Sequence, residues 1–308
     1  MSAYTASSRR GFPWLGALVA VMLVFASVTV QVARDRRYPQ SQVDDRLLYV
    51  RSGEALKRLV LSYDALAADI YWMRAIQHFG GERRSTSTRR YDLLYPLLEL
   101  TTALDPLFSA AYRFGAIFLS EPFPSGAGRP DLAIRLLQQG IKHDPRWQYF
   151  HDVGFIYYWH TGRYSEAADW FQRAAARPGA PYWLTPLAAA TLAEGGQRGA
   201  SRLLWEQLRI TSDTEFMRQA AERRLVQLNT LDLIDRIEPY IVRYAEANPY
   251  GPLTWERLYA AGVLRGIPLD PTGVPFDLNP WWGTLTVSEK SSLFPMPAEP
   301  GPRPPAHP

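Results

Sequence analysis

Histidine and acidic side chains are the residues through which this chain could do chemistry, because it contains no cysteine. Without cysteine it cannot form a disulfide, use a thiol nucleophile or hold a metal through sulfur. Helical metal sites place two ligands three or four residues apart, and no two histidines have that spacing. We therefore expect no metal site, and a surface or groove-lining role for His78, His143, His151, His160 and His307.

The best-spaced carboxylates are Asp232, Asp235 and Glu238, which would form an acidic stripe along one helix. Paired carboxylates do acid–base chemistry when they are buried and held apart on either side of a scissile bond. Here Arg236 and Arg243 lie on the same segment and can neutralise the stripe. We interpret it as a solvated face.

Asp270, Asp277 and Asn279 lie in a glycine-containing loop, and their side-chain oxygens are possible ligands of a calcium ion. Their spacing does not match the calcium loop of an EF-hand, where ligands occupy every second position. The sequence also lacks a phosphate loop, the H-E-x-x-H and G-x-S-x-G motifs and a dinucleotide-binding glycine fingerprint. We expect a non-catalytic protein without a cofactor.

The elements that would position these side chains follow from a pattern that returns five times. A small or apolar residue is followed by an apolar residue four positions later, a third residue three further on, and a Pro, Gly or Ser after five more. The first three share one helix face, and the last ends the helix. The matches start at Leu94, Ala133, Ala167, Ala200 and Ile237, at intervals of 39, 34, 33 and 37 residues.

The clearest unit runs from Val153 to Tyr158 (V-G-F-I-Y-Y) and from Gly162 to Ala174 (G-R-Y-S-E-A-A-D-W-F-Q-R-A). It resembles the tetratricopeptide repeat (TPR) sequence L-G-x-x-Y…G-x-Y-x-x-A…F-x-x-A, with one extra residue between the helices. The resemblance covers residues 52–265 and is strongest at the centre. It implies an all-α fold, a TPR-like α-solenoid of about five helix pairs.

The resemblance also implies which side chains line the concave groove of such a solenoid. These are Tyr112, Gln148, His151, Phe155, Tyr158, Trp159, Tyr182 and Thr185. A groove of Tyr, Trp and His suits an extended peptide or a partner helix, because these side chains combine a large contact area with a polar tip. The alternative is that the aromatic residues only pack between repeats or under the C-terminal segment.

Hydrophobic spacing predicts an all-helical body between residues 52 and 265. Ser52 is expected to cap the first helix, and Gly80-Gly81 to end it after about Phe79. The face of this helix expected to turn inward carries Leu56, Leu59, Val60, Tyr63, Leu66, Ala67, Ile70 and Met73. Ser212-Asp213-Thr214-Glu215 is a capping box that would open a later helix. The other helices are expected at about 91–103, 108–119, 130–142, 147–160, 164–176, 181–193, 197–210, 213–228, 231–247 and 253–264.

Residues 266–308 are expected to form a capping extension with a proline-rich tail. Segments 274–278 and 284–287 can pair as one short hairpin, which Pro275 would restrict to an edge. We expect Trp281 and Trp282 to pack on the last helix and cover its apolar end.

Residues 11–33 carry no charge and are long enough to cross a bilayer as a helix. A cleavable signal peptide is the alternative, but its apolar region would be shorter and would end in a small-x-small site. The sequence thus predicts a short cytoplasmic tail (1–11), a transmembrane helix (12–33) and a polar linker (34–51) before the helical body.

The orientation of that helix is open, because Arg9 and Arg10 flank one side and Arg34, Arg36 and Arg37 the other. Short N-terminal tails usually stay inside, which favours a bacterial inner-membrane protein with its solenoid on the periplasmic side. Ser8-Arg9-Arg10-Gly11-Phe12 also resembles the start of a twin-arginine export signal, although Pro13-Trp14 departs from it.

These features predict a membrane-anchored scaffold that holds a partner protein segment and supports assembly of a membrane or envelope complex. Arginines are scattered among acidic residues and the net charge is only +4, so we expect no nucleic-acid partner. One alternative is a module that binds envelope polysaccharide. The other is an α/α enzyme built from dispersed acids such as Asp64, Asp69 or Asp152.

Overall fold

The computed structural model describes residues 21–30, 32–33, 56–58, 60–85 and 89–298. Residues 21–30 and 32–33 are helical. Within the described ranges, no helix combines the length and apolar character needed to span a bilayer. The predicted tail, residues 12–20 and 31 of the predicted transmembrane helix, the linker and the Ser52 cap lie outside these ranges.

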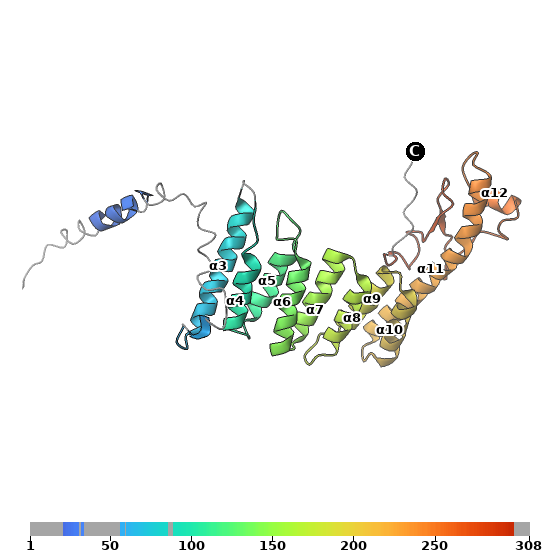
Figure 1. Cartoon of the computed structure of the whole chain (residues 1–308). Coiled ribbons are helices and arrows are strands. Elements are labelled where there is room, and N and C mark those ends of the chain that lie inside the picture. Colours follow the sequence, from blue (N-terminus) through green and yellow to red (C-terminus); the bar gives the residue numbers. More distant parts are fainter. Residues whose placement is uncertain (1–20, 31, 34–55, 59, 86–88, 299–308) are drawn as a thin grey trace, which may run out of the picture.

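The described body is all-α, as predicted. From α3 to α11, each helix packs against the next one in the chain, so that they follow one another in a row (Figure 1). The bounds are α3 Asp64–Arg84, α4 Leu94–Leu104, α5 Ser109–Ser120, α6 Pro130–His143, α7 Trp147–Ile156, α8 Tyr164–Ala175, α9 Leu184–Glu194, α10 Arg198–Thr211, α11 Glu215–Ala247 and α12 Trp255–Ala260.

Helix α3 differs from the prediction at both ends. It begins at Asp64, after Leu61 and Ser62 adopt positive φ angles of 49° and 75°, which an α-helix does not allow. It continues through Gly80 and Gly81 to Arg84, where Arg83 and Arg84 interact favourably with the negative end of the helix dipole. A glycine pair only weakens a helix, so it did not stop this one.

The buried face of α3 is only partly the predicted one, since Ala67 is buried as expected. Tyr71 and Phe79 are buried, whereas Leu66, Ile70 and Met73 are exposed. Trp72 and Phe79 stack on Phe118 of α5, at ring-centroid distances of 6.1 and 4.2 Å. This contact with α5 selects the face of α3 that turns inward.

The predicted helices at 213–228 and 231–247 are one helix, α11. No break occurs between them: Thr230 lies within the helix, and its hydroxyl donates to the Val226 carbonyl at 2.8 Å. The N-cap is Thr214 rather than Ser212, and the Thr214 hydroxyl accepts a hydrogen bond from the Met217 amide.

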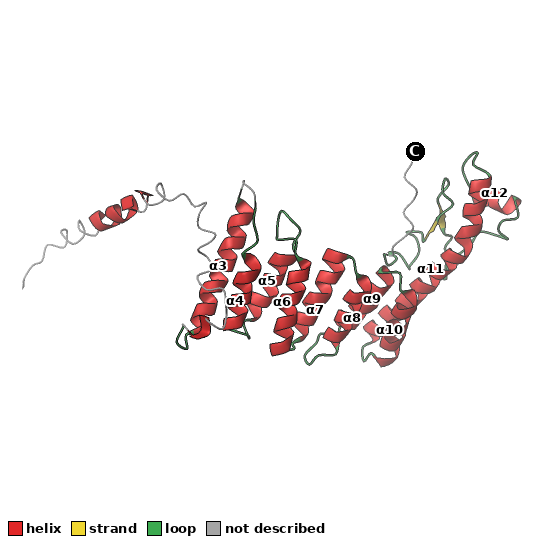
Figure 2. Ribbon diagram, in the orientation of Figure 1, coloured by secondary structure: helices red, strands yellow, loops and turns green. Residues whose placement is uncertain are grey.

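The predicted hairpin near the C-terminus is confirmed: β1, Asp277–Leu278, pairs antiparallel with β2, Leu285–Thr286 (Figure 2). This region covers the end of α11, but not through the tryptophans. Trp281 is 68% exposed and Trp282 is 37% exposed. The covering side chains are Phe276, Leu285, Val287 and Leu293, which pack with Ile234, Ile241, Leu253 and Leu258.

Candidate partner-binding surface

Helix α7 is held tightly against α8 by a glycine. A Cβ placed on Gly154 would lie 2.7 Å from the Phe171 ring and 3.1 Å from the Ala167 carbonyl oxygen. Only glycine permits this approach without a shift of the neighbours. The buried face of α7 is therefore fixed, and the opposite face carries large aromatic side chains into solvent.

Phe155 and Trp159 are the centre of that exposed face. They are four residues apart, so they stand on the same side of successive helical turns. Their rings stack nearly parallel, with centroids 6.2 Å apart and an interplanar angle of 5°. Phe155 is 43% exposed and Trp159 is 67% exposed.

A π-helical segment, Tyr157–Thr161, follows α7 directly. The extra residue noted in the sequence lies in this segment, which ends at Gly162 with a φ of 64°. A left-handed conformation of this kind favours glycine.

The exposed rings of α7 continue onto the start of α9. The His151 ring lies 6.4 Å from Phe155 and 5.5 Å from Trp183, between centroids. Trp147 contacts Trp183 edge to face at 6.1 Å. We call Trp147, His151, Phe155, Trp159 and Trp183 the aromatic surface.

An ion pair joins the aromatic surface to α5. Arg113 Nε donates to Asp152 Oδ2 at 2.6 Å, and His151 Nδ1 lies 3.1 Å from Asp152 Oδ1. The hydrogen bond to Asp152 raises the pKa of Arg113 above its usual value. The other two dispersed acids, Asp64 and Asp69, belong to α3 at the far end of the row, so the three carboxylates do not meet (Figure 1).

A second polar contact joins the π-helical segment after α7 to the end of α9. The Tyr158 hydroxyl donates to Glu194 Oε2 at 2.7 Å. Burial, followed by the neighbouring Glu194 carboxylate, raises the pKa of Tyr158 to about 12. This contact fixes the spacing of α7 and α9 where the aromatic surface ends.

Most of the predicted groove residues lie on or beside this surface. His151, Phe155 and Trp159 belong to it, Tyr158 faces α9, and Tyr182 is 77% exposed beside Trp183. Gln148 and Thr185 are half-buried on the same two helices.

Tyr112 is a correction, because it is 1% exposed. Its ring lies 5.5 Å from the Tyr149 ring and fills the space beside Gly140, where a Cβ would lie 3.1 Å from it. The exposed apolar residues of α5 are instead Phe114 and Ile117. Trp147 and Trp183 belong to the aromatic surface but were not among the predicted groove residues. The four-residue spacing of Trp147 and His151 would have placed both on one helix face.

The acidic stripe of α11 is neutralised by α10 rather than by its own helix. Arg198 donates to Asp232 and Asp235 at 3.1 and 2.6 Å, and Arg202 donates to Asp232 at 2.6 Å. Glu238 accepts from the Leu285 amide at 3.0 Å. The stripe is a structural network that joins α10, α11 and β2.

Of the three calcium candidates, Asp270 and Asn279 form turns and Asp277 lies in β1. Asp270 Oδ1 accepts from the Thr272 and Val274 amides at 2.8 and 3.0 Å, and its second oxygen accepts from Ser291. Asn279 Oδ1 accepts from the amides of Trp281 and Trp282, each at 3.0 Å. Among the described residues no cluster of acids and histidines could hold a metal.

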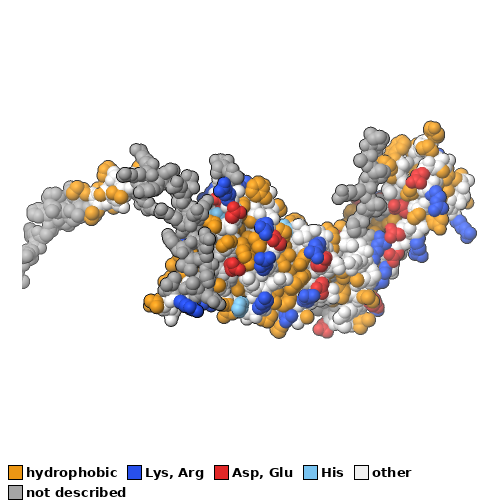
Figure 3. Space-filling model, viewed as in Figure 1, with side chains coloured by type: hydrophobic (Ala, Val, Ile, Leu, Met, Phe, Trp, Pro, Cys, Tyr) orange, Lys and Arg blue, Asp and Glu red, His pale blue; other side chains and the backbone are white. Residues whose placement is uncertain are grey.

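Charges alternate over the visible face of the helical body, where blue and red side chains lie beside one another (Figure 3). Ion pairs also form within single helices of the body, such as Arg173 with Asp169 and Arg209 with Glu206. This face presents no continuous basic stripe of the kind that binds nucleic acid.

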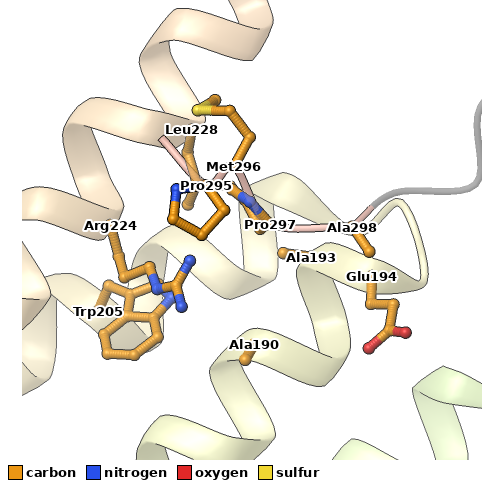
Figure 4. A pocket seen from close by; sticks show the side chains of 10 residues that line it. All are labelled: Ala190, Ala193, Glu194, Trp205, Arg224, Leu228, Pro295, Met296, Pro297 and Ala298. Carbon is orange, nitrogen blue, oxygen red and sulfur yellow. The ribbon is translucent and has the colours of Figure 1, made fainter. Parts of the chain in front are cut away.

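A second surface lies across α9, α10 and α11, where residues 293–298 run over the helices. We call these residues the C-terminal segment. Two cavities of about 280 and 350 Å³ lie beside it, and both are lined by Arg224 and Pro295. The smaller cavity also contacts Trp205, Ala190 and Glu194 (Figure 4).

No protein-family model, curated protein or solved structure matches this chain.

Proposed function

We propose that this chain is a non-catalytic, TPR-like α-solenoid of about five helix pairs, which binds a segment of a partner protein on its aromatic surface. In this proposal residues 12–33 anchor it in a bacterial inner membrane with the solenoid on the periplasmic side. It would support assembly or stability of a membrane or envelope complex. The packing of consecutive helices in chain order and the Gly154–Phe171 contact support the solenoid part.

The observation that carries the proposal is the exposed, parallel stack of Phe155 and Trp159. Aromatic rings left in water lose the free energy that burial would provide, about 25 cal/mol per Å² of apolar area. Rings already held in one orientation bind at a low entropic cost, since they do not have to be ordered. Such clusters are typical of the centres of protein interfaces.

The test is recovery of crosslinked partners in mild detergent, with Phe155→Ala/Trp159→Ala compared with the unmodified chain. We expect recovery to fall about tenfold or more, since truncation of a central aromatic residue commonly costs about 2 kcal/mol or more of binding free energy. The matched control is Tyr250→Ala/Tyr259→Ala, which removes two exposed rings away from this surface. Equal recovery from both variants would refute the proposal.

Envelope polysaccharide is the second candidate ligand, because the parallel rings of Phe155 and Trp159 offer a flat apolar face on which a sugar could stack. Affinity electrophoresis through cell-wall glycans distinguishes the two. A retarded chain whose retardation is lost in Phe155→Ala/Trp159→Ala would favour the glycan over the peptide.

The membrane side can be tested independently because the chain contains no cysteine. Tyr250→Cys introduces a single thiol at a position that is 89% exposed. On intact inner-membrane spheroplasts, a membrane-impermeant maleimide should label this thiol. Labelling only after lysis would place the helical body on the cytoplasmic side.

A further inference from the structure

The C-terminal segment is held on α11 through its backbone. Gln227 Nε2 donates to the carbonyls of Leu293 and Pro295 at 2.6 and 2.9 Å. Arg223 donates to the carbonyl between them, that of Phe294, at 2.9 Å. Three successive carbonyls are thus bound by side chains of one helix, some seventy residues away in sequence.

The donor and acceptor types of the two partners match. Pro295 and Pro297 have no N–H group, so the segment offers mainly carbonyl acceptors to its surroundings. The surface of α11 answers with donors, and the Gln227 side chain is 1% exposed. Arg224 donates to Gln227 Oε1 at 2.9 Å and so orients the amide donors toward the segment. This arrangement recognises an extended, proline-containing backbone.

The segment fills its site poorly. Pro295 lies between the two cavities, and both remain open beside it. Burial and the neighbouring Arg223 charge lower the pKa of Arg224, yet its only described hydrogen-bond acceptor is the neutral Gln227 oxygen. A partly buried guanidinium gains most from a carboxylate, which can accept two parallel hydrogen bonds. No carboxylate of the described residues forms an ion pair with it.

We propose that this surface of α9 and α11 is a site for an extended, proline-containing peptide with an acidic side chain, and that the C-terminal segment occupies the site until such a peptide displaces it. The inference rests on the proposed function, because the peptide would belong to the same partner. Glu194 connects the two surfaces, since it lines the smaller cavity and binds Tyr158 next to Trp159.

The probe is a fluorescent synthetic peptide with the sequence of residues 290–298, in its own form and with Pro295→Glu. Pro295 is the position to change because it is the residue of the C-terminal segment that lines both cavities with Arg224. The protein is the full chain, compared with a released variant that carries Phe294→Gly, Pro295→Ser, Met296→Gly and Pro297→Ser. Far-UV circular dichroism verifies that both retain their helices.

We expect the released variant to bind the unmodified peptide about tenfold more tightly than the full chain, because a site that is open a tenth of the time shows a tenfold weaker apparent affinity. The acidic peptide should bind the released variant more tightly again, by about tenfold. Arg224→Gln should remove the advantage of the acidic peptide. Arg218→Gln should not, since Arg218 is paired with Glu215 on the exposed face of the same helix.

Equal binding to the full chain and the released variant, or no binding to either, would overturn the inference. So would an acidic advantage that survives Arg224→Gln. These outcomes leave the pull-down with Phe155→Ala/Trp159→Ala unaffected, so a failure here is separable from a failure of the proposed function. A shorter variant, Phe294→Gly/Pro295→Gly, replaces the released variant if the latter loses helical content.

Discussion

The aromatic surface and the surface under the C-terminal segment are built by neighbouring helices, but they differ in what they present. On α7 and the start of α9, large rings face solvent, and Trp159 and Tyr182 are 67% and 77% exposed. On α11, side-chain donors bind the carbonyls of residues 293–295 of the same chain. The first surface is open and apolar. The second is covered by the C-terminal segment and holds it through hydrogen bonds.

The difference follows from what lies beneath each surface. Under the rings, Gly154 brings α7 so close to Phe171 that the outer face cannot turn inward. The end of α11 packs instead with the short helix α12, through Leu258, and with non-helical chain that carries Phe276, Leu285 and Leu293. The packed helix pair leaves rings outside, whereas α11 binds the carbonyls of a non-helical segment.

The largest expected effect compares the two cores. Phe171 and Phe276 are both nearly fully buried, one under each surface. Replacing either by Ala should lower the free energy of unfolding by about 3–5 kcal/mol, measured by urea denaturation. We expect Phe171→Ala to speed hydrogen exchange throughout α7–α9, and Phe276→Ala only from α11 to the C-terminal segment. Identical exchange maps would mean that the two regions unfold as one unit.

The next effect tests whether glycine sets the packing of α7. Gly154→Ala should lower the free energy of unfolding by about 1–3 kcal/mol, because its Cβ overlaps the Phe171 ring. The matched control is Gly80→Ala in α3, where a Cβ meets no neighbour. There Ala should raise the free energy of unfolding by about 0.5–1 kcal/mol through helix propensity alone. If both variants were stabilised, the close approach of α7 and α8 would not be a constraint.

A local effect is expected at the covered surface. Gln227→Leu removes two donors from the C-terminal segment and should cost about 1–3 kcal/mol, because the carbonyls of Leu293 and Pro295 lose their partners. The amides of Phe294, Met296 and Ala298 should then exchange faster, with α7 unchanged. Gln219→Leu, an exposed change on the same helix, serves as the control. Unchanged exchange in Gln227→Leu would show that the segment is held by other contacts.

The smallest effect concerns the tyrosine between the two surfaces. Tyr158 keeps its proton in the folded state up to a pKa of about 12, above the ordinary tyrosine value of 10.0. Its contribution to stability is therefore complete below pH 10 and is lost as the pH rises from 10 to 12. Subtracting the alkaline absorbance titration of Tyr158→Phe from that of the unmodified chain should isolate this phenol. Glu194→Gln should move it to lower pH, and no movement would mean that burial alone sets the value.

The repeating pattern predicted the helices well, because it records which side chains can share one buried face. At α3, where the predicted buried face was partly wrong, the contact with Phe118 of α5 decided which side chains turn inward. Helix α11 runs without a break through residues 229–230, where the prediction separated two helices.

The aromatic surface was predicted only in part, since a register error of one residue turns a side chain by about 100° around a helix. Tyr112 was predicted to line the groove but belongs to the core. Trp183, which lies beside the predicted groove residue Tyr182, is the residue that contacts Trp147 on the aromatic surface. The contact of Gln227 with residues 293–295 has no local signature, because nothing in either segment identifies its partner across such a distance in the chain.

The π-helical segment Tyr157–Thr161 has a consequence for how such a surface could diversify. One additional residue in a single turn changes the direction of every side chain after it, while Gly154 and the turns before it keep their packing. A single insertion or deletion at this point would therefore exchange the ring presented by Trp159 for another residue without rebuilding the helix pair. Relatives of this chain could acquire different partners by changing the length of one turn.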